Sequence, residues 1–175
     1  MTGSHRARLV VIALLASAAD ALTKIGAVHW LADPVELPGL TLRVTRNPGI
    51  AFGLGADQPA AVVLAVTGLA VAALAVAVWR GLLGGPVPSG LVLGGGVANL
   101  VDRAIGGSVV DVFDLGWWPV FNLADVFIVA GVGMLLLAAI AHDRDRDVSE
   151  GPASTTETPV SGKPRRTTIP RSPSG

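Results

Sequence analysis

Cysteine is absent from this chain, which excludes disulfide bonds, thiol nucleophiles and cysteine-ligated metal sites. Histidine is scarce, because His5, His29 and His142 are the whole supply and lie far apart. A histidine metal cluster or a serine–histidine triad is therefore a poor expectation, and we expect neither a metal nor a cofactor. The net charge is zero, so the chain has no general electrostatic attraction to nucleic acid.

Charged residues make up only 15% of the 175 residues, whereas 51% are hydrophobic. This composition is typical of a small membrane protein. Twenty helical residues span about 30 Å, the thickness of the hydrocarbon core of a bilayer. The sequence therefore predicts a mainly α membrane protein with four transmembrane helices within residues 1–141, and the predicted spans are 9–31, 60–79, 88–103 and 121–141.

The first apolar segment contains charged residues. Asp20 and Lys24 lie four residues apart, so they share one face of a helix. They could neutralise each other as an ion pair or line a polar cavity. The start of the chain also has the features of a cleavable signal peptide, with Ala16-Ser17-Ala18 as the cleavage site. The three later spans favour a retained first helix.

The second and third spans are separated from the first by a region of different character, residues 32–58. Residues 40–45 alternate between apolar and polar side chains, which predicts a half-buried strand. Arg46-Asn47-Pro48-Gly49 is a turn signal, and residues 50–53 could be a second extended piece or the approach to a helix. We expect a small amphipathic β-platform at the membrane surface.

The third span is rich in glycine. Gly90, Gly94 and Ala98 recur every four residues, a pattern that lets helices approach closely in lipid. An adjacent face carries Asn99, Asp102 and Arg103, of which the last two are adjacent charges that could neutralise each other. The same helix is thus expected to be packed on one side and polar on another.

Basic residues predict the orientation of the chain, because they concentrate on the cytoplasmic side of bacterial membrane proteins. Four of the thirteen fall on the predicted outer side or near it: Lys24, Arg43, Arg46 and Arg103. The other nine fall on the inner side, so both termini should be cytoplasmic and the platform should face outward. Residues 142–175 are polar and rich in Ser, Thr and Pro, which predicts a disordered cytoplasmic tail.

Two carboxylates, Asp111 and Asp125, flank the loop that enters the fourth span. If the loop folds back, they meet at the outer membrane surface and share a proton, so that one could act as a base toward water and the other as an acid. Alternatives stay open: Asp125 could only complete a helix cap with Asn122, and Asp114 could replace Asp111. Two other functions also stay open. One is an ion or proton pathway through Asp20, Lys24 and Asp102, and the other is a purely structural membrane protein.

Four stretches, taken together, resemble lipoprotein signal peptidase, the bacterial signal peptidase II, over roughly residues 8–141. They are Asp20 with Lys24, the run RNPGIAFG at 46–53, the run GGVANLVDR at 95–103 with GSVVD at 107–111, and PVFNLAD at 119–125. The chain departs from the family pattern at Pro48-Gly49-Ile50 and at Val112, and neither departure changes a reacting group.

The resemblance implies a membrane aspartyl endopeptidase in the bacterial cytoplasmic membrane, with its active site at the extracytoplasmic face. Its substrates would be prolipoproteins that carry a diacylglyceryl group on the cysteine after the cleavage point. Asp111 and Asp125 match the catalytic pair. The supporting positions are Asn47, Asn99, Asp102, Arg103, Asn122, Asp20 and Lys24. We expect a monomer whose partners are these substrates and membrane lipids, and which binds no nucleic acid.

Overall fold

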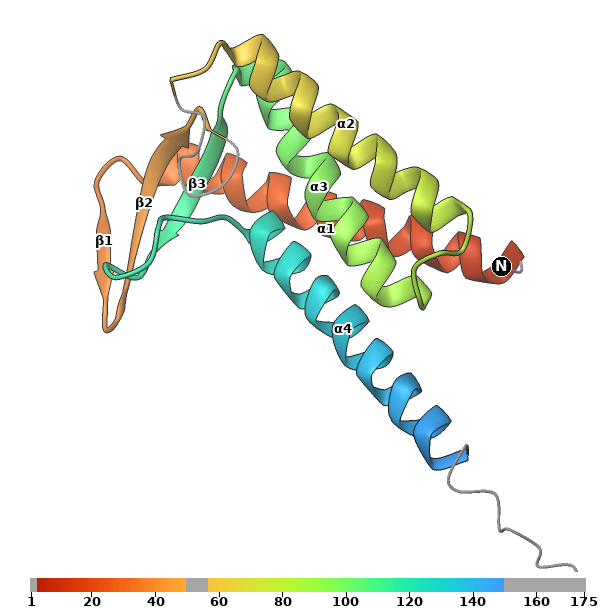
Figure 1. Ribbon diagram of the computed structural model, residues 1–175. Helices are drawn as coiled ribbons and strands as arrows, with labels where there is room; N and C mark the ends of the chain where they lie inside the picture. The colour runs from red at the N-terminus through yellow and green to blue at the C-terminus, as the bar shows by residue number, and fades with distance from the viewer. Residues whose placement is uncertain (1–2, 50–56, 150–175) are drawn as a thin grey trace, which may run out of the picture.

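The computed structural model describes residues 3–49 and 57–149. Four helices and three strands alternate along the chain, with the sheet at one end of the helices (Figure 1). In chain order they are α1 (Gly3–Trp30), β1 (Val35–Leu37), β2 (Leu40–Asn47), α2 (Ala60–Trp79), α3 (Pro86–Gly106), β3 (Val109–Asp114) and α4 (Leu123–Ser149). This arrangement confirms the prediction of a mainly α protein with four helices and a small sheet.

Helix α3 is the centre of the bundle, since α1, α2 and α4 all pack against it. Glycine makes the close approach possible. A Cβ atom on Gly94 would lie 2.5 Å from the main-chain oxygen of Ala13 in α1, and one on Gly95 would lie 2.5 Å from that of Ala124 in α4. The predicted small-residue face is therefore the contact with α1, and Gly95 extends the same packing to α4.

Three helices in the described part of the chain are long and apolar enough to cross a membrane: α1, α2 and the first 19 residues of α4. Their outward faces carry exposed large apolar side chains such as Leu14, Leu69 and Leu137. In water such a surface would be a liability, but it is the expected surface toward lipid. Helix α3 is as long as α2 but less apolar, because it carries Asp102 and Arg103 near its end.

The three strands form an antiparallel sheet in the order β1-β2-β3. Thr45 pairs with Asp111, and Asn47 pairs with Val109, so the end of β2 lies beside the start of β3. An isolated bridge between Phe113 and Phe121 closes the loop that follows β3. The chain therefore folds back as predicted, and it delivers residue 122 to the side of residue 111.

The structure differs from the sequence prediction at several boundaries. Strand β1 was not predicted, because its three residues are all exposed and too few to show a period. Helix α4 does not end at Ala141 but continues to Ser149, since the first glycine or proline after Ala141 is Gly151. The predicted tail boundary at 141/142 thus lies inside a helix. The prediction for residues 50–53 lies largely outside the described residues.

Two glycines of α4 offer a matched test of the packing. A Cβ on Gly131 would lie 2.7 Å from the main-chain oxygen of Pro88, whereas one on Gly133 would meet nothing within 4 Å. Gly131→Ala should lower the free energy of unfolding by about 1–3 kcal/mol, because it forces α3 and α4 apart. Gly133→Ala should leave it unchanged or raise it by up to about 1 kcal/mol, since alanine favours the helix. Thermal unfolding in one detergent measures both, and equal effects would show that α3 and α4 do not approach this closely.

Candidate active site

The candidate site begins at the first turn of α4, whose main-chain N–H groups need partners. Asn122 is the residue before the helix, and its Oδ1 accepts the N–H of Asp125 at 3.0 Å. In return, Oδ2 of Asp125 accepts the N–H of Asn122 at 3.2 Å. Oδ1 of Asp20, from the middle of α1, accepts the N–H of Ala124 at 2.8 Å. The predicted cap is present, and a second helix completes it.

Lys24 lies one turn after Asp20 and is almost fully buried, with 4% of its surface exposed. Its ammonium group has three protons and finds three acceptors. These are Oδ2 of Asp20 at 2.6 Å, Oδ2 of Asp102 at 2.7 Å and Oδ1 of Asn99 at 3.2 Å. We call Asp20, Lys24, Asn99 and Asp102 the Lys24 cluster. The predicted Asp20–Lys24 pair is thus part of a larger buried network, which is how a charge survives between membrane helices.

We had expected Asp102 to form an ion pair with Arg103. It forms one with Lys24 instead. Adjacent residues on a helix point in directions about 100° apart, so the two charges face different neighbours. Arg103 donates instead to the main-chain oxygens of Asn99 at 3.1 Å and Gly49 at 2.6 Å. Asp102, Asp111 and Asp125 all lie near enough to attract its charge. Asp102 also accepts the N–H of Val110 at 3.3 Å, which ties β3 to α3.

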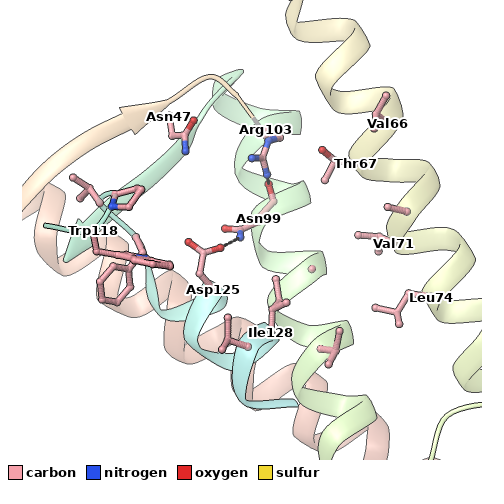
Figure 2. A pocket seen from close by; sticks show the side chains of 17 residues that line it. Asn47, Val66, Thr67, Val71, Leu74, Asn99, Arg103, Trp118, Asp125 and Ile128 are labelled. Carbon is pink, nitrogen blue, oxygen red and sulfur yellow. Dashed lines mark hydrogen bonds between the residues drawn. The ribbon is translucent and has the colours of Figure 1, made fainter. Parts of the chain in front are cut away.

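Asn99 connects the Lys24 cluster to the first turn of α4. Because its Oδ1 faces the ammonium of Lys24, its Nδ2 is left to donate to Oδ1 of Asp125 at 2.9 Å (Figure 2). Both oxygens of Asp125 therefore accept N–H groups, one from α3 and one from Asn122. Asp125 is half-buried and faces the cavity described below.

Asp111 lies in β3, where its side chain is buried with 3% of the residue exposed. Its Oδ1 accepts Nδ2 of Asn122 at 2.7 Å, so Asn122 touches both aspartates. Burial, together with the nearby charge of Asp125, raises the pKa of Asp111 from 3.8 to about 6. Hydrogen bonds from Asn122 and Asn47 oppose this shift. The structure therefore brings Asp111 and Asp125 into electrostatic contact.

Asn47 ends β2 and faces the same place. Its Oδ1 accepts the N–H of Gly49 at 2.9 Å, and this Asx-type turn leaves its Nδ2 free to donate toward Asp111. Asn47, Asn99 and Asn122 thus share one arrangement. In each, a fixed donor holds the oxygen, so the nitrogen points at a carboxylate.

Asp114, the alternative partner, lies elsewhere. Its Oδ2 accepts Nε of Arg43 at 2.7 Å, and its Oδ1 accepts the N–H of Gly116 at 2.7 Å in the turn after β3. The hydrogen bond from Gly116, followed by the contact with Arg43, lowers the pKa of Asp114. Asp114 is therefore an ionised residue of the platform and not part of the cluster around Asp125.

A cavity of about 440 Å³ opens beside Asp125, between α2 on one side and α3 with α4 on the other. We call it the α2–α4 groove. Figure 2 shows Asn47, Asn99, Arg103 and Asp125 at its polar end, with Val66, Val71 and Leu74 of α2 across from them. The rest of the lining is mostly apolar: Thr67, Ala70, Val92, Gly96, Trp118, Pro119, Val120, Phe121, Ile128 and Val129. The groove can therefore hold an apolar chain with a polar group at Asp125.

Sequence reasoning missed two features of this site. The cap that Asp20 forms on α4 joins residues 104 positions apart, and only the packing of α1 against α4 reveals it. The apolar lining from α2 gives no signal, because a lipid-facing residue and a groove-facing residue of a membrane helix are equally apolar. Among the described residues there is no group of three or more His, Cys, Asp or Glu side chains placed to hold a metal ion.

The sequence also matches proteins of one known family. A profile of the family described as signal peptidase (SPase) II matches residues 12–141. The lipoprotein signal peptidase of Rhodococcus jostii is 37% identical over 150 residues, which cover 80% of this chain and 76% of that protein. That of Syntrophomonas wolfei is 41% identical over 111 residues, which cover 62% of this chain and 73% of that protein.

Solved structures agree with the sequence relatives. A bacterial membrane enzyme determined by the in meso method at 2.3 Å resolution matches with a TM-score of 0.62 and 25% identity. The match covers 82% of this chain and 91% of that one. A second such enzyme, at 1.9 Å resolution, matches with a TM-score of 0.60 and 24% identity and supports the fold alone. From the profile match over most of its length and from these relatives, the chain belongs to the signal peptidase II family, a family of membrane proteases.

Proposed function

We propose that this protein is an aspartic endopeptidase that removes the signal peptide from diacylglyceryl-modified prolipoproteins, with Asp111 and Asp125 as its catalytic pair. One observation carries the aspartic mechanism. The carboxylate of Asp111 in β3 accepts the side-chain amide of Asn122, the carboxylate of Asp125 in α4 accepts the main-chain N–H of Asn122, and Asp125 faces an apolar groove. Asp20 and Asp102 both form ion pairs with Lys24 within one buried cluster, so these charges contact one another and do not form a row across the membrane, as the transporter alternative would need.

The chemistry needs one proton shared by the two carboxylates. The ionised carboxylate removes a proton from water, whose oxygen bonds to the carbonyl carbon of the scissile peptide. The electron pair of the carbonyl double bond moves to its oxygen, which takes the proton of the other carboxyl group. The resulting diol collapses: the C–N bond breaks, the nitrogen takes the proton gained from water, and a diol hydroxyl returns the remaining proton. One water is consumed, and the pair is restored.

The groove fits such a substrate. Its apolar walls from α2, α3 and α4 suit acyl chains and the apolar part of a signal peptide. Its polar end places Asn47, Asn99 and Arg103 beside Asp125, where they can bind the peptide main chain. Asp20, Lys24 and Asp102 are not part of the groove lining, so we assign them to support of the site and not to substrate contact.

We propose that the protein lies in the bacterial cytoplasmic membrane as a monomer, with both termini cytoplasmic and the active site at the extracytoplasmic face. The distribution of basic residues along the sequence supports this orientation. The peptidase domain would comprise residues 1–141, followed by a cytoplasmic tail.

Removing either carboxylate should abolish cleavage. Asp111→Asn and Asp125→Asn keep the shape of each side chain but remove the proton relay, so turnover should fall by at least about a thousandfold. Purified protein with a diacylglyceryl-modified prolipoprotein measures this. The control is Asp114→Asn, which removes an acid of the same strand and should retain most activity. Normal processing by either of the first two variants would falsify the assignment of the pair.

Stability should depend on pH through Asp111. Its pKa is about 6 in the folded protein against 3.8 for an ordinary aspartate, so the folded state binds more protons in between. Its contribution to stability is therefore present below pH 3.8 and is lost as the pH rises through 6. Asp111→Asn should be more stable than the original protein at pH 7, by up to about 3 kcal/mol, and equally stable at pH 3.5. Thermal unfolding at the two pH values measures the difference, which Asp114→Asn should not show.

Residues after α4 should be dispensable for cleavage. The described contacts of the site all involve residues before 130. A chain ending at Ser149 should therefore process the same substrate at a rate within about twofold of the full chain in detergent. A large loss of turnover, with the melting temperature unchanged, would show that residues 150–175 take part in the reaction.

A further inference from the structure

The two aspartates are in different surroundings, and this difference has a chemical consequence. Asp125 is half-buried, faces the groove and accepts an N–H on each carboxylate oxygen. It also lies in the first turn of α4, where the helix dipole stabilises a negative charge. Both of its oxygens thus serve as hydrogen-bond acceptors, as those of a carboxylate do.

Asp111 is placed in the opposite way. It is buried, with 3% of the residue exposed, so little solvent is left to stabilise its charge. Its strand partner, Thr45 of β2, carries no charge to compensate. The charged groups that act on it are Asp125 from α4, which opposes ionisation, and Lys24 from α1, which is already engaged with two carboxylates. Arg103 of α3 attracts both aspartates.

The amide of Asn99 enforces this asymmetry. Lys24 can only donate, so Oδ1 of Asn99 must face it, and Nδ2 must face Asp125. A flipped amide would set Nδ2 against an ammonium and Oδ1 against a carboxylate. The amide of Asn99 fills the same space in either orientation. Lys24 therefore decides which end of this amide faces Asp125, and the end that faces it is the donor.

We propose that, in the singly protonated form of the pair that the reaction needs, the proton lies on Asp111, while Asp125 is ionised and is the general base toward water, and that Asn99 is a positioning residue that holds Asp125 in this form. The assignment rests on the proposed function, in which the two residues form the catalytic pair. Asp125 then faces the water in the groove, and Asp111 supplies the proton to the carbonyl oxygen.

Infrared titration tests where the proton lies without relying on activity, because protonated and ionised carboxyl groups absorb at different frequencies. The original protein in detergent should show a carboxyl band that is lost as the pH rises through about 6. Asp125→Asn should keep this band with a lower midpoint, because the neighbouring charge is gone. Asp111→Asn should lose it. The reverse pattern would place the proton on Asp125 and overturn the proposal, even if both variants were inactive as the proposed function requires.

Two variants of Asn99 separate positioning from packing. Asn99→Asp has the same shape and keeps an acceptor for Lys24, but it presents an oxygen to Asp125. Asn99→Ala removes the donor and the volume. If Asn99 only packs, Asn99→Asp should be the milder change.

On our proposal Asn99→Asp is the more severe change. At one fixed pH, kcat should fall further in Asn99→Asp than in Asn99→Ala, with little change in KM, because the repulsive contact acts on the reacting group and not on substrate binding. A smaller loss of kcat in Asn99→Asp than in Asn99→Ala would exclude the positioning role.

Discussion

An ammonium group buried between membrane helices can persist only if every proton has an acceptor, and this requirement at Lys24 determines the arrangement of the site. Its three acceptors come from α1 and α3. Asp20 joins α1 to the start of α4, Asp102 joins α3 to β3, and Asn99 reaches the aspartate that faces the groove. One buried charge thus fixes the relative positions of three helices and the sheet. Loss of any one of the three acceptors would leave a buried N–H of Lys24 without a partner.

These hydrogen bonds require main chains that lie unusually close, and glycine on α3 provides that closeness. Gly94 faces α1 and Gly95 faces α4. Helix α3 therefore contacts both helices about one turn before Asn99. One turn of α3 therefore provides the close packing, and the next turn carries the polar residues of the site. Helix association in lipid depends on close van der Waals contact and on interhelical hydrogen bonds, and α3 provides both.

Much of the fold and the closeness of Asp111 to Asp125 could be predicted from the sequence, because apolar length, small-residue spacing and helix-cap signals are local. Helix α2 has the bounds that its apolar run predicts, and the Asn122–Asp125 cap is present as expected. The partner of Asp102 could not be predicted. Arg103 is adjacent in the sequence and was the expected partner. The actual partner is Lys24 of α1, which lies 78 residues earlier in the chain. The proton assignment also needs burial, which spacing does not report.

The length of α4 has a mechanical consequence. Its 27 residues extend about 40 Å, roughly 10 Å more than the hydrocarbon core. The first turn is anchored by the cap and by Asp125, so the excess length emerges at the other end. Figure 1 shows this end of α4 diverging from the other helices. The last turns of α4 are thus longer than a membrane span needs, and they lengthen the helix beyond its contacts with the other three.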